Sequence, residues 1–223
     1  MKAEHRTRFT QAVRWSAVIL AGVGYSVLEH MAASAPTPSL FGALVAITPL
    51  TAIACVLAWR SPHRPLMLAL CAAALVAMYL MSDGLLAHYE WVFLLQHAGI
   101  YALLCFAFGR TLQSGHTPMV TGLARMVHDT MTPALIRYTR GVTWAWTIYF
   151  GATSALSLLL FWFAPIAVWS AFAYLLSPVL LVVVFAVEYA ARFLVLPASD
   201  RAGPLEAIQA YRRRSANGSV HRP

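Results

Sequence analysis

Long apolar stretches are the feature that most restricts how this chain can fold. Six stretches of mostly apolar residues approach the length of about 20 residues that an α-helix needs to cross a hydrocarbon layer of about 30 Å. A helix also satisfies its own backbone hydrogen bonds, which lipid cannot do. The sequence therefore predicts an all-α, polytopic membrane protein that forms a single integral membrane domain over residues 1–223. The six predicted transmembrane helices cover residues 12–33, 40–59, 65–81, 91–108, 142–163 and 166–189.

The first of these stretches has a second interpretation. Its uninterrupted apolar part covers only residues 15–28, and small residues follow at positions 33–35, so it also fits the outline of a cleaved signal peptide. Pro36 would directly follow the cleavage point, which favours a retained span. The five later spans keep their orientation in either case.

The positions of the basic residues predict how the spans are oriented. All 16 Lys and Arg residues fall in the N-terminal segment, after the second and fourth spans, or at and beyond the end of the last span. Basic loops are retained on the cytoplasmic side during membrane insertion. We therefore expect both termini to be cytoplasmic, together with a hairpin over residues 109–141 and a tail over residues 190–223.

Composition excludes several classes of protein. With 60% hydrophobic and 11% charged residues, the chain lies outside the statistics of soluble globular domains. A pI of about 9.9 is compatible with nucleic-acid binding, but the Arg residues lie between apolar stretches rather than on an aqueous face, so no nucleic-acid partner is expected. Cys55, Cys71 and Cys105 lie inside predicted spans and no metal-ligand spacing occurs, so we expect no metal and no other cofactor.

Small and helix-breaking residues inside the spans predict how the helices pack. Thr147, Gly151 and Ser154 share one stripe of the fifth span, where small residues let two helix backbones approach closely. Pro49 and Pro178 lie near the middle of their spans, and we expect them to kink their helices.

The predicted hairpin over residues 109–141 contains an amphipathic segment. Pro118 suits the start of a short helix that lies in the headgroup plane. At about 100° per residue, the apolar stripe of this helix consists of Met119, Val120, Leu123, Met126 and Val127, and the polar side consists of Thr121, Arg125, His128 and Asp129. A second helix is expected to begin at Thr132 and Pro133 and to continue without a break into the fifth span.

The same hairpin carries the main candidate binding residues. Guanidinium groups are bidentate donors to phosphate and carboxylate, so we expect an anionic partner at this surface. The predicted anion-binding set is Arg110, Arg125, Arg137, Tyr138 and Arg140. His128 and Asp129 are weak candidates for a catalytic acid or base. The alternative is a purely electrostatic attachment of these residues to anionic lipid of the cytoplasmic leaflet.

A second polar set lies in or near the spans on the opposite side. It consists of Glu29, Glu90, His97 and Tyr101, of which the last three share one face of the fourth span. Ionisable residues are costly in hydrocarbon and are often functional, which leaves a proton-relay or ligand role open for His97. The favoured interpretation is a core histidine that is hydrogen-bonded by Gln96, Tyr101 or a backbone carbonyl.

The end of the last span and the tail show ordinary helical patterns. Glu188 and Arg192 are four residues apart and are predicted to form an ion pair along their helix. Pro204 suits the first position of a further helix, and the basic residues at 212–214 should hold the tail near an anionic leaflet.

The stretch over residues 108–150 resembles a family of uncharacterised bacterial inner-membrane proteins. The most specific matches are FGRTL at residues 108–112 and RYTRGVTWAW at residues 137–146. The family is associated with gene clusters for aryl-polyene and related polyketide pigments. The resemblance implies a multi-pass protein of the bacterial inner membrane that works beside acyl-carrier-dependent enzymes, and it brings no catalytic residues to transfer.

These observations favour a non-catalytic accessory protein for the assembly or export of a lipid-linked polyketide or aryl-polyene product. Its hairpin would contact acyl-carrier protein or polyketide-assembly enzymes, whose acidic surfaces suit an arginine-rich segment. Two alternatives remain open. One is a small transporter or flippase that uses the outer polar residues, and the other is a membrane-embedded acyl or glycosyl transferase with His128 as its base.

Overall fold

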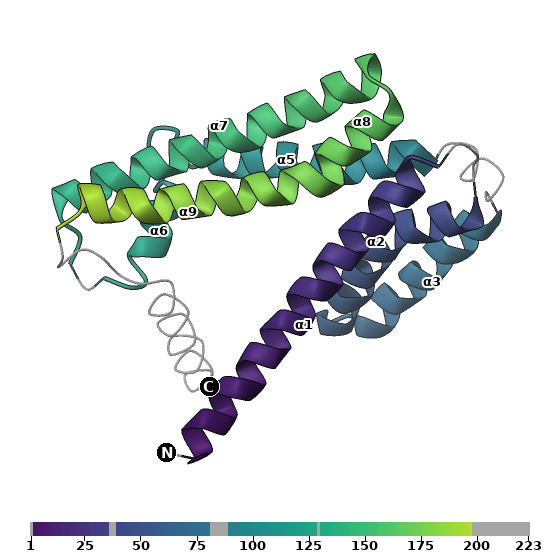
Figure 1. Cartoon of the computed structure of the whole chain (residues 1–223), viewed down its shortest axis with the longest axis horizontal. Coiled ribbons are helices and arrows are strands. Elements are labelled where there is room, and N and C mark those ends of the chain that lie inside the picture. Colours follow the sequence, from purple (N-terminus) through teal and green to yellow (C-terminus); the bar gives the residue numbers. More distant parts are fainter. Residues whose placement is uncertain (1, 36–38, 81–88, 129, 198–223) are drawn as a thin grey trace. The chain divides into compact units, whose positions relative to one another are not determined.

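The described part of the chain is helical. The computed structural model describes residues 2–35, 39–80, 89–128 and 130–197, and no strand occurs in these ranges (Figure 1). The all-α prediction is therefore confirmed for this part. The elements are α1 (Lys2–Ala33), α2 (Leu40–Arg60), α3 (Arg64–Leu80), α5 (Tyr89–Arg110), α6 (Met119–Ala124), α7 (Pro133–Phe163), α8 (Ile166–Ser170), the π-helical segment η1 (Ala171–Leu176) and α9 (Ser177–Val195). The predictions for Asp129 and for the tail from residue 198 lie outside the described residues.

Five helical segments of the described chain are long and apolar enough to cross a membrane. They cover Val13–Ala33, Leu40–Arg60, Glu90–Arg110, Pro133–Phe163 and Ile166–Val195. Large apolar side chains on them are exposed, with Leu95 at 70% and Val182 at 66%, as expected for helices that are surrounded by lipid. The chain thus has the helices of an integral membrane protein, and five of the six predicted spans correspond to them. Helix α3 is also apolar but has 17 residues, about 26 Å at 1.5 Å per residue, so its crossing remains a prediction.

Two helices extend well beyond the ends that the sequence predicts. Helix α1 begins at Lys2, ten residues before the predicted span, because no glycine or proline interrupts residues 2–21. The last helix continues to Val195 instead of ending at residue 189. An ion pair of 2.8 Å between Arg192 and Glu188 stabilises this additional length.

The chain divides into two compact units, each with its own packing. The first unit consists of Met1–His97 and Ser157–Pro178. In it, α2 packs against α3 and α1, and α1 also contacts α8 and η1 (Figure 1). Phe93 and Trp169 are completely buried in this unit.

Pro49 has a clear structural consequence within the first unit. A proline lacks the N–H that would bond to the carbonyl four residues earlier, which here is that of Val45. The Tyr25 hydroxyl of α1 donates to this carbonyl at 2.7 Å. The amide of Gln96 on α5 donates to the next carbonyl, that of Ala46. Pro49 therefore leaves the Val45 carbonyl available to bind α2 to α1.

The second unit consists of Ala98–Leu156 and Val179–Pro223. Its buried core is formed by Val142, Trp146 and Phe150 of α7, against which aromatic residues of α5 pack. The rings of Phe108 and Phe150 lie 5.3 Å apart in an edge-to-face arrangement.

The predicted small-residue stripe of α7 forms the close contact between α5 and α7 in the second unit. A Cβ added at Gly151 would lie 3.1 Å from Cys105 Sγ, which is tighter than an ordinary Cβ contact, so the cysteine side chain would have to shift. The Ser154 hydroxyl donates to the Ala98 carbonyl of α5 at 2.9 Å. The role predicted for this stripe is confirmed.

Candidate functional site

The four predicted arginines lie on the second unit and are exposed. Arg110 ends α5, Arg125 follows α6, and Arg137 and Arg140 lie in the first turns of α7. Arg125 donates to the Thr117 hydroxyl and Arg140 donates to the Leu112 carbonyl, each at a distance of 3.4 Å. Within the described ranges, none of the four forms an ion pair with a carboxylate. Their guanidinium groups therefore retain donors for an anionic partner.

Threonine hydroxyls fix the position of α6, the short helix that lies between Arg110 and Arg125 in the chain. The first N–H groups of a helix have no partner within the helix itself. In α6, the Met119 N–H donates to Thr111 Oγ1 at 2.9 Å and the Val120 N–H donates to Thr143 Oγ1 at 3.2 Å. Because Thr111 follows α5 and Thr143 lies on α7, both flanking segments fix the start of α6.

A third contact corrects the predicted position of Thr121 on α6. Thr121 was expected on the polar side, yet it is only 1% exposed. Its hydroxyl lies 2.8 Å from that of the buried Thr139 on α7. Leu123 of the predicted apolar stripe is 53% exposed, as expected of a side chain that inserts into lipid. The pairing of the two hydroxyls turns Thr121 inward, which a pattern based on hydropathy alone cannot predict.

Helix α6 is also shorter than predicted. It ends at Ala124 rather than continuing through Val127. The N–H groups of Met126 and Val127 bond to carbonyls three residues earlier, at 3.1 and 3.0 Å, which tightens the last turn and ends the α-helix.

The predicted start of α7 is confirmed. Thr132 precedes Pro133, and its hydroxyl accepts the Leu135 N–H at 3.1 Å, as a helix-capping residue does. The helix then continues without interruption to Phe163. Arg137 and Arg140 are thus carried by the capped end of a helix of 31 residues.

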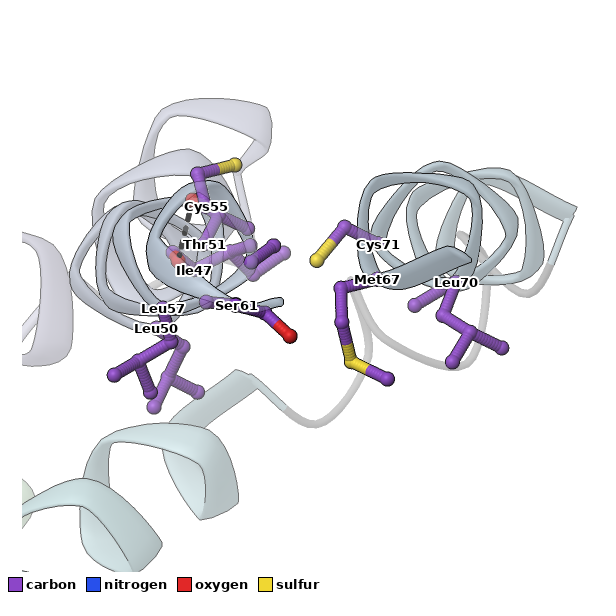
Figure 2. A pocket seen from close by; sticks show the side chains of 12 residues that line it. Ile47, Leu50, Thr51, Cys55, Leu57, Ser61, Met67, Leu70 and Cys71 are labelled. Carbon is purple, nitrogen blue, oxygen red and sulfur yellow. Dashed lines mark hydrogen bonds between the residues drawn. The ribbon is translucent and has the colours of Figure 1, made fainter. Parts of the chain in front are cut away.

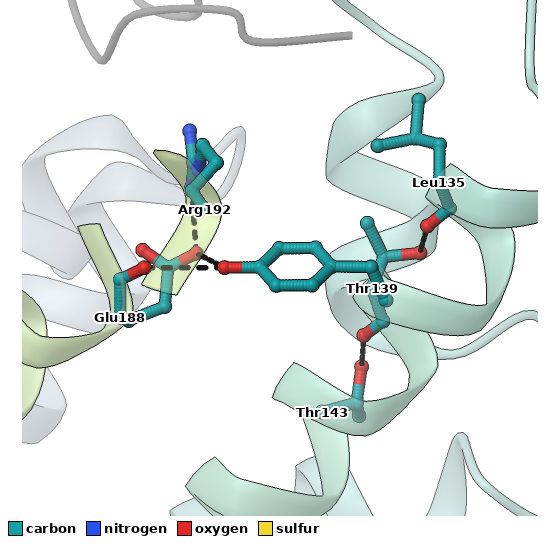
Figure 3. A network of polar contacts seen from close by, with 6 residues as sticks. Leu135, Thr139, Thr143, Glu188 and Arg192 are labelled. Carbon is teal, nitrogen blue, oxygen red and sulfur yellow. Dashed lines mark hydrogen bonds and ion pairs between the residues drawn. The ribbon is translucent and has the colours of Figure 1, made fainter. Parts of the chain in front are cut away.

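Tyr138 belongs to a different set of contacts from the arginines. Its hydroxyl lies 3.1 Å from the Glu188 carbonyl and 3.2 Å from Glu188 Oε1 on α9. Arg192 Nη2 lies 2.8 Å from the same carboxylate oxygen, which confirms the predicted helical pair (Figure 3). Tyr138 therefore joins α7 to α9. This contact could not be predicted from the sequence, because 50 residues separate the partners.

His128 is half-buried, and its Nδ1 lies 3.2 Å from the Ala124 carbonyl. One ring nitrogen of His128 thus contacts a backbone carbonyl of its own turn. For His128 to act as a base, its other ring nitrogen must face the substrate. Asp129, its predicted companion, is outside the described ranges.

His97 is the centre of a buried polar cluster in the first unit. The residue is 8% exposed. Its Nδ1 lies 3.0 Å from Ser157 Oγ on α7 and its Nε2 lies 3.1 Å from Ser177 Oγ on α9. Trp169 Nε1 donates to the same Ser157 oxygen at 3.0 Å. A neutral imidazole donates from one nitrogen and accepts at the other, and serine hydroxyls can complement either arrangement.

The prediction that His97 is buried and hydrogen-bonded is therefore confirmed, and its structural rather than transport role stays a prediction. The serine hydroxyls that bond to it come from two other helices and had not been predicted. Gln96, which was expected to assist, donates to the carbonyl of Ala46 on α2.

The other residues of the outer polar set do not belong to the hydrogen-bonded cluster around His97. Glu29 is half-buried on α1, and Glu90 is half-buried at the start of α5. Tyr101 belongs to the second unit, where its ring contacts those of Tyr149 and Phe150. The helical face expected for Glu90, His97 and Tyr101 thus serves hydrogen bonding at His97 and aromatic packing at Tyr101.

Within the part of the chain that the structure describes, no three His, Cys, Asp or Glu side chains lie together as metal ligands. Comparison with protein-family models, with curated proteins and with solved structures finds no match for this chain.

Proposed function

We propose that this chain is a non-catalytic accessory protein of the bacterial inner membrane. Its hairpin over residues 109–141 would present arginines to an anionic partner, in support of the assembly or export of a lipid-linked polyketide or aryl-polyene product. The observation that carries this proposal is the combination of four exposed arginines, without carboxylate partners in the described ranges, and a hairpin held by threonine hydroxyls.

A fixed hairpin favours recognition of a defined partner. Ordering a flexible loop on binding costs free energy, and a loop that is already ordered avoids this cost. Acidic acyl-carrier protein fits the charge and the bidentate geometry of the arginines. Anionic lipid of the cytoplasmic leaflet also binds arginines, with about 1 kcal/mol for each, and would keep the hairpin at the membrane surface.

The proposal includes six spans and a cytoplasmic hairpin. If α3 did not cross, the hairpin would lie on the side opposite to the N-terminal basic residues, contrary to the retention of basic loops in the cytoplasm. An even number of crossings places all basic segments on one side. In a variant without native cysteines, Arg125→Cys should resist an impermeant thiol reagent added to intact cells and react after lysis. Efficient labelling of intact cells would refute this topology.

The binding role is tested by reversing charge at the hairpin. Arg137→Glu combined with Arg140→Glu should abolish the polyene absorbance of the native bacterium, because both exposed donors become repulsive to an anion. The matched variant with lysine at both positions keeps the charge and should retain part of the pigment. Immunoblots of membrane fractions should show equal amounts of all variants. Unchanged pigment in the glutamate variant would refute the proposal.

A further inference from the structure

An apolar cavity lies between α2 and α3 of the first unit. It has a volume of about 570 Å³, within the range of about 300–1,000 Å³ that is typical of pockets for small molecules. Its lining includes Leu50 and Cys55 of α2 and Met67, Leu70 and Cys71 of α3. Figure 2 shows Met67 and the sulfur of Cys71 directed toward the space between the two helices. Such a lining suits a flexible hydrocarbon chain.

One end of this cavity lies next to a basic turn. Ser61, which follows α2, lines the cavity, and its hydroxyl accepts the His63 N–H at 3.2 Å. Arg60 and Arg64 flank this turn and are exposed. The Arg64 guanidinium lies 3.1 Å from the centre of the Trp59 ring, a cation–π contact that orders its side chain. Residues 40–80 contain no Asp or Glu.

We infer that this cavity holds one acyl chain of an anionic phospholipid, whose phosphate binds at the turn formed by residues 60–64. The apolar lining takes the chain, and two guanidinium groups offer paired donors to the phosphate oxygens. This site shares no residue with the hairpin over residues 109–141, so failure of this inference would leave the proposed binding role of that hairpin intact.

Charge favours a lipid over a second copy of this chain as the occupant. Copies inserted in the same orientation would bring two basic turns to the same side of the membrane, and like charges across an interface are repulsive. An anionic lipid neutralises the turn and fills the cavity at once. A zwitterionic lipid fills the cavity equally well but gains less at Arg60 and Arg64, so the site should prefer the anion.

The apolar part of the site is tested by filling it. Ala54 on α2 and Ala74 on α3 line the cavity and are exposed, so tryptophan at either position occupies the space without entering a packed core. Ala52→Trp and Ala73→Trp are matched controls, because both positions are exposed on the same helices and do not line the cavity. The full chain is reconstituted in vesicles of phosphatidylcholine and phosphatidylglycerol, extracted in mild detergent and weighed by native mass spectrometry.

The wild-type chain and both control variants should retain one phosphatidylglycerol molecule. Ala54→Trp and Ala74→Trp should each reduce this retention about tenfold, the change that corresponds to about 1.4 kcal/mol of binding free energy. Circular dichroism verifies that helix content is unchanged. Two variants on facing helices ensure that a folding defect in one does not decide the result. Equal retention by filling and control variants would overturn the assignment of the cavity.

The charged part of the site is tested separately. Arg60→Gln and Arg64→Gln should each lower the preference for phosphatidylglycerol over phosphatidylcholine about fivefold, which corresponds to about 1 kcal/mol for each arginine. Arg14→Gln removes an exposed charge from α1 and should leave this preference unchanged. Wild-type chain that retains both lipids equally would overturn the anionic preference. Lipid-free dimers that dissociate in Ala74→Trp would assign the cavity to a second copy and overturn the proposal.

Discussion

Replacement of His97 by leucine separates a structural role of the buried cluster from a transport role. Leucine fills much of the space of the imidazole but offers no hydrogen bond to Ser157 or Ser177. In the wild-type chain, the ring nitrogens lie 3.0 and 3.1 Å from these two hydroxyls. We therefore expect His97→Leu to insert into the membrane and fold, with lower stability.

The expected loss follows from the two contacts. Hydrogen bonds between membrane helices contribute about 0.6 kcal/mol on average and about 1.7 kcal/mol at most. Two of them give about 1.2 kcal/mol, with an upper bound of about 3.4 kcal/mol. Ser157 also accepts the Trp169 N–H at 3.0 Å, so Ser157→Ala loses two contacts with other side chains where Ser177→Ala loses one. The loss for Ser157→Ala should be about twice that for Ser177→Ala.

Double-mutant cycles in bicelles measure these contributions. The free energy of unfolding is determined by reversible denaturation for His97→Leu, for each serine variant and for each pair. A coupling of about 0.6 kcal/mol is expected between His97 and either serine. Coupling near zero in both cycles would refute the hydrogen-bonded cluster. If His97→Leu keeps its stability and abolishes export of the polyene product, the transport alternative gains over the structural role.

Substitutions at three other positions test further contacts through their effect on stability. Gly151→Leu should unfold more easily than Gly141→Leu by about 1–3 kcal/mol, because an added Cβ contacts α5 at the first position and meets nothing within 4 Å at the second; equal stability of the two variants would contradict the close α5–α7 contact. Thr132→Ala should lower stability by about 1 kcal/mol and accelerate amide exchange in the first turn of α7, and unchanged exchange would count against the cap. Tyr25→Phe should destabilise the chain less in a Pro49→Ala background, because the restored N–H at position 49 competes for the same carbonyl of α2; identical losses measured in both backgrounds would exclude this mechanism.

Features that depend on neighbours in the sequence could be predicted from the sequence. The apolar length of five of the six predicted spans, the cap at Thr132 and the pair between Glu188 and Arg192 all involve residues within one helix. The close contact at Gly151 could also be predicted, because small side chains on one stripe are a property of a single helix. Each of these predictions is confirmed.

Features that depend on a second helix could not be predicted in the same way. The serine partners of His97 lie 60 and 80 residues away in the chain, and serine is too common in spans to indicate its partner. Thr121 was placed on the wrong side of α6 because hydropathy treats a hydroxyl as exposed, whereas Thr139 offers it a buried partner. The cavity between α2 and α3 arises from how two helices pack, which periodicity within either helix does not determine.

The polar groups of this chain differ in whether their hydrogen-bonding capacity is already used. In hydrocarbon, an unsatisfied polar group costs several kcal/mol, so the spans must enclose groups such as His97 with partners of their own. Arginines at the membrane surface are hydrated and carry no such requirement. Among the residues that the structure describes, exposed arginine donors lie in the hairpin over residues 109–141, in the turn formed by residues 60–64 and at Arg14 of α1, and we expect recognition of a polar partner at the first two segments. Substitutions there should change binding before stability, and substitutions around His97 should change stability before binding.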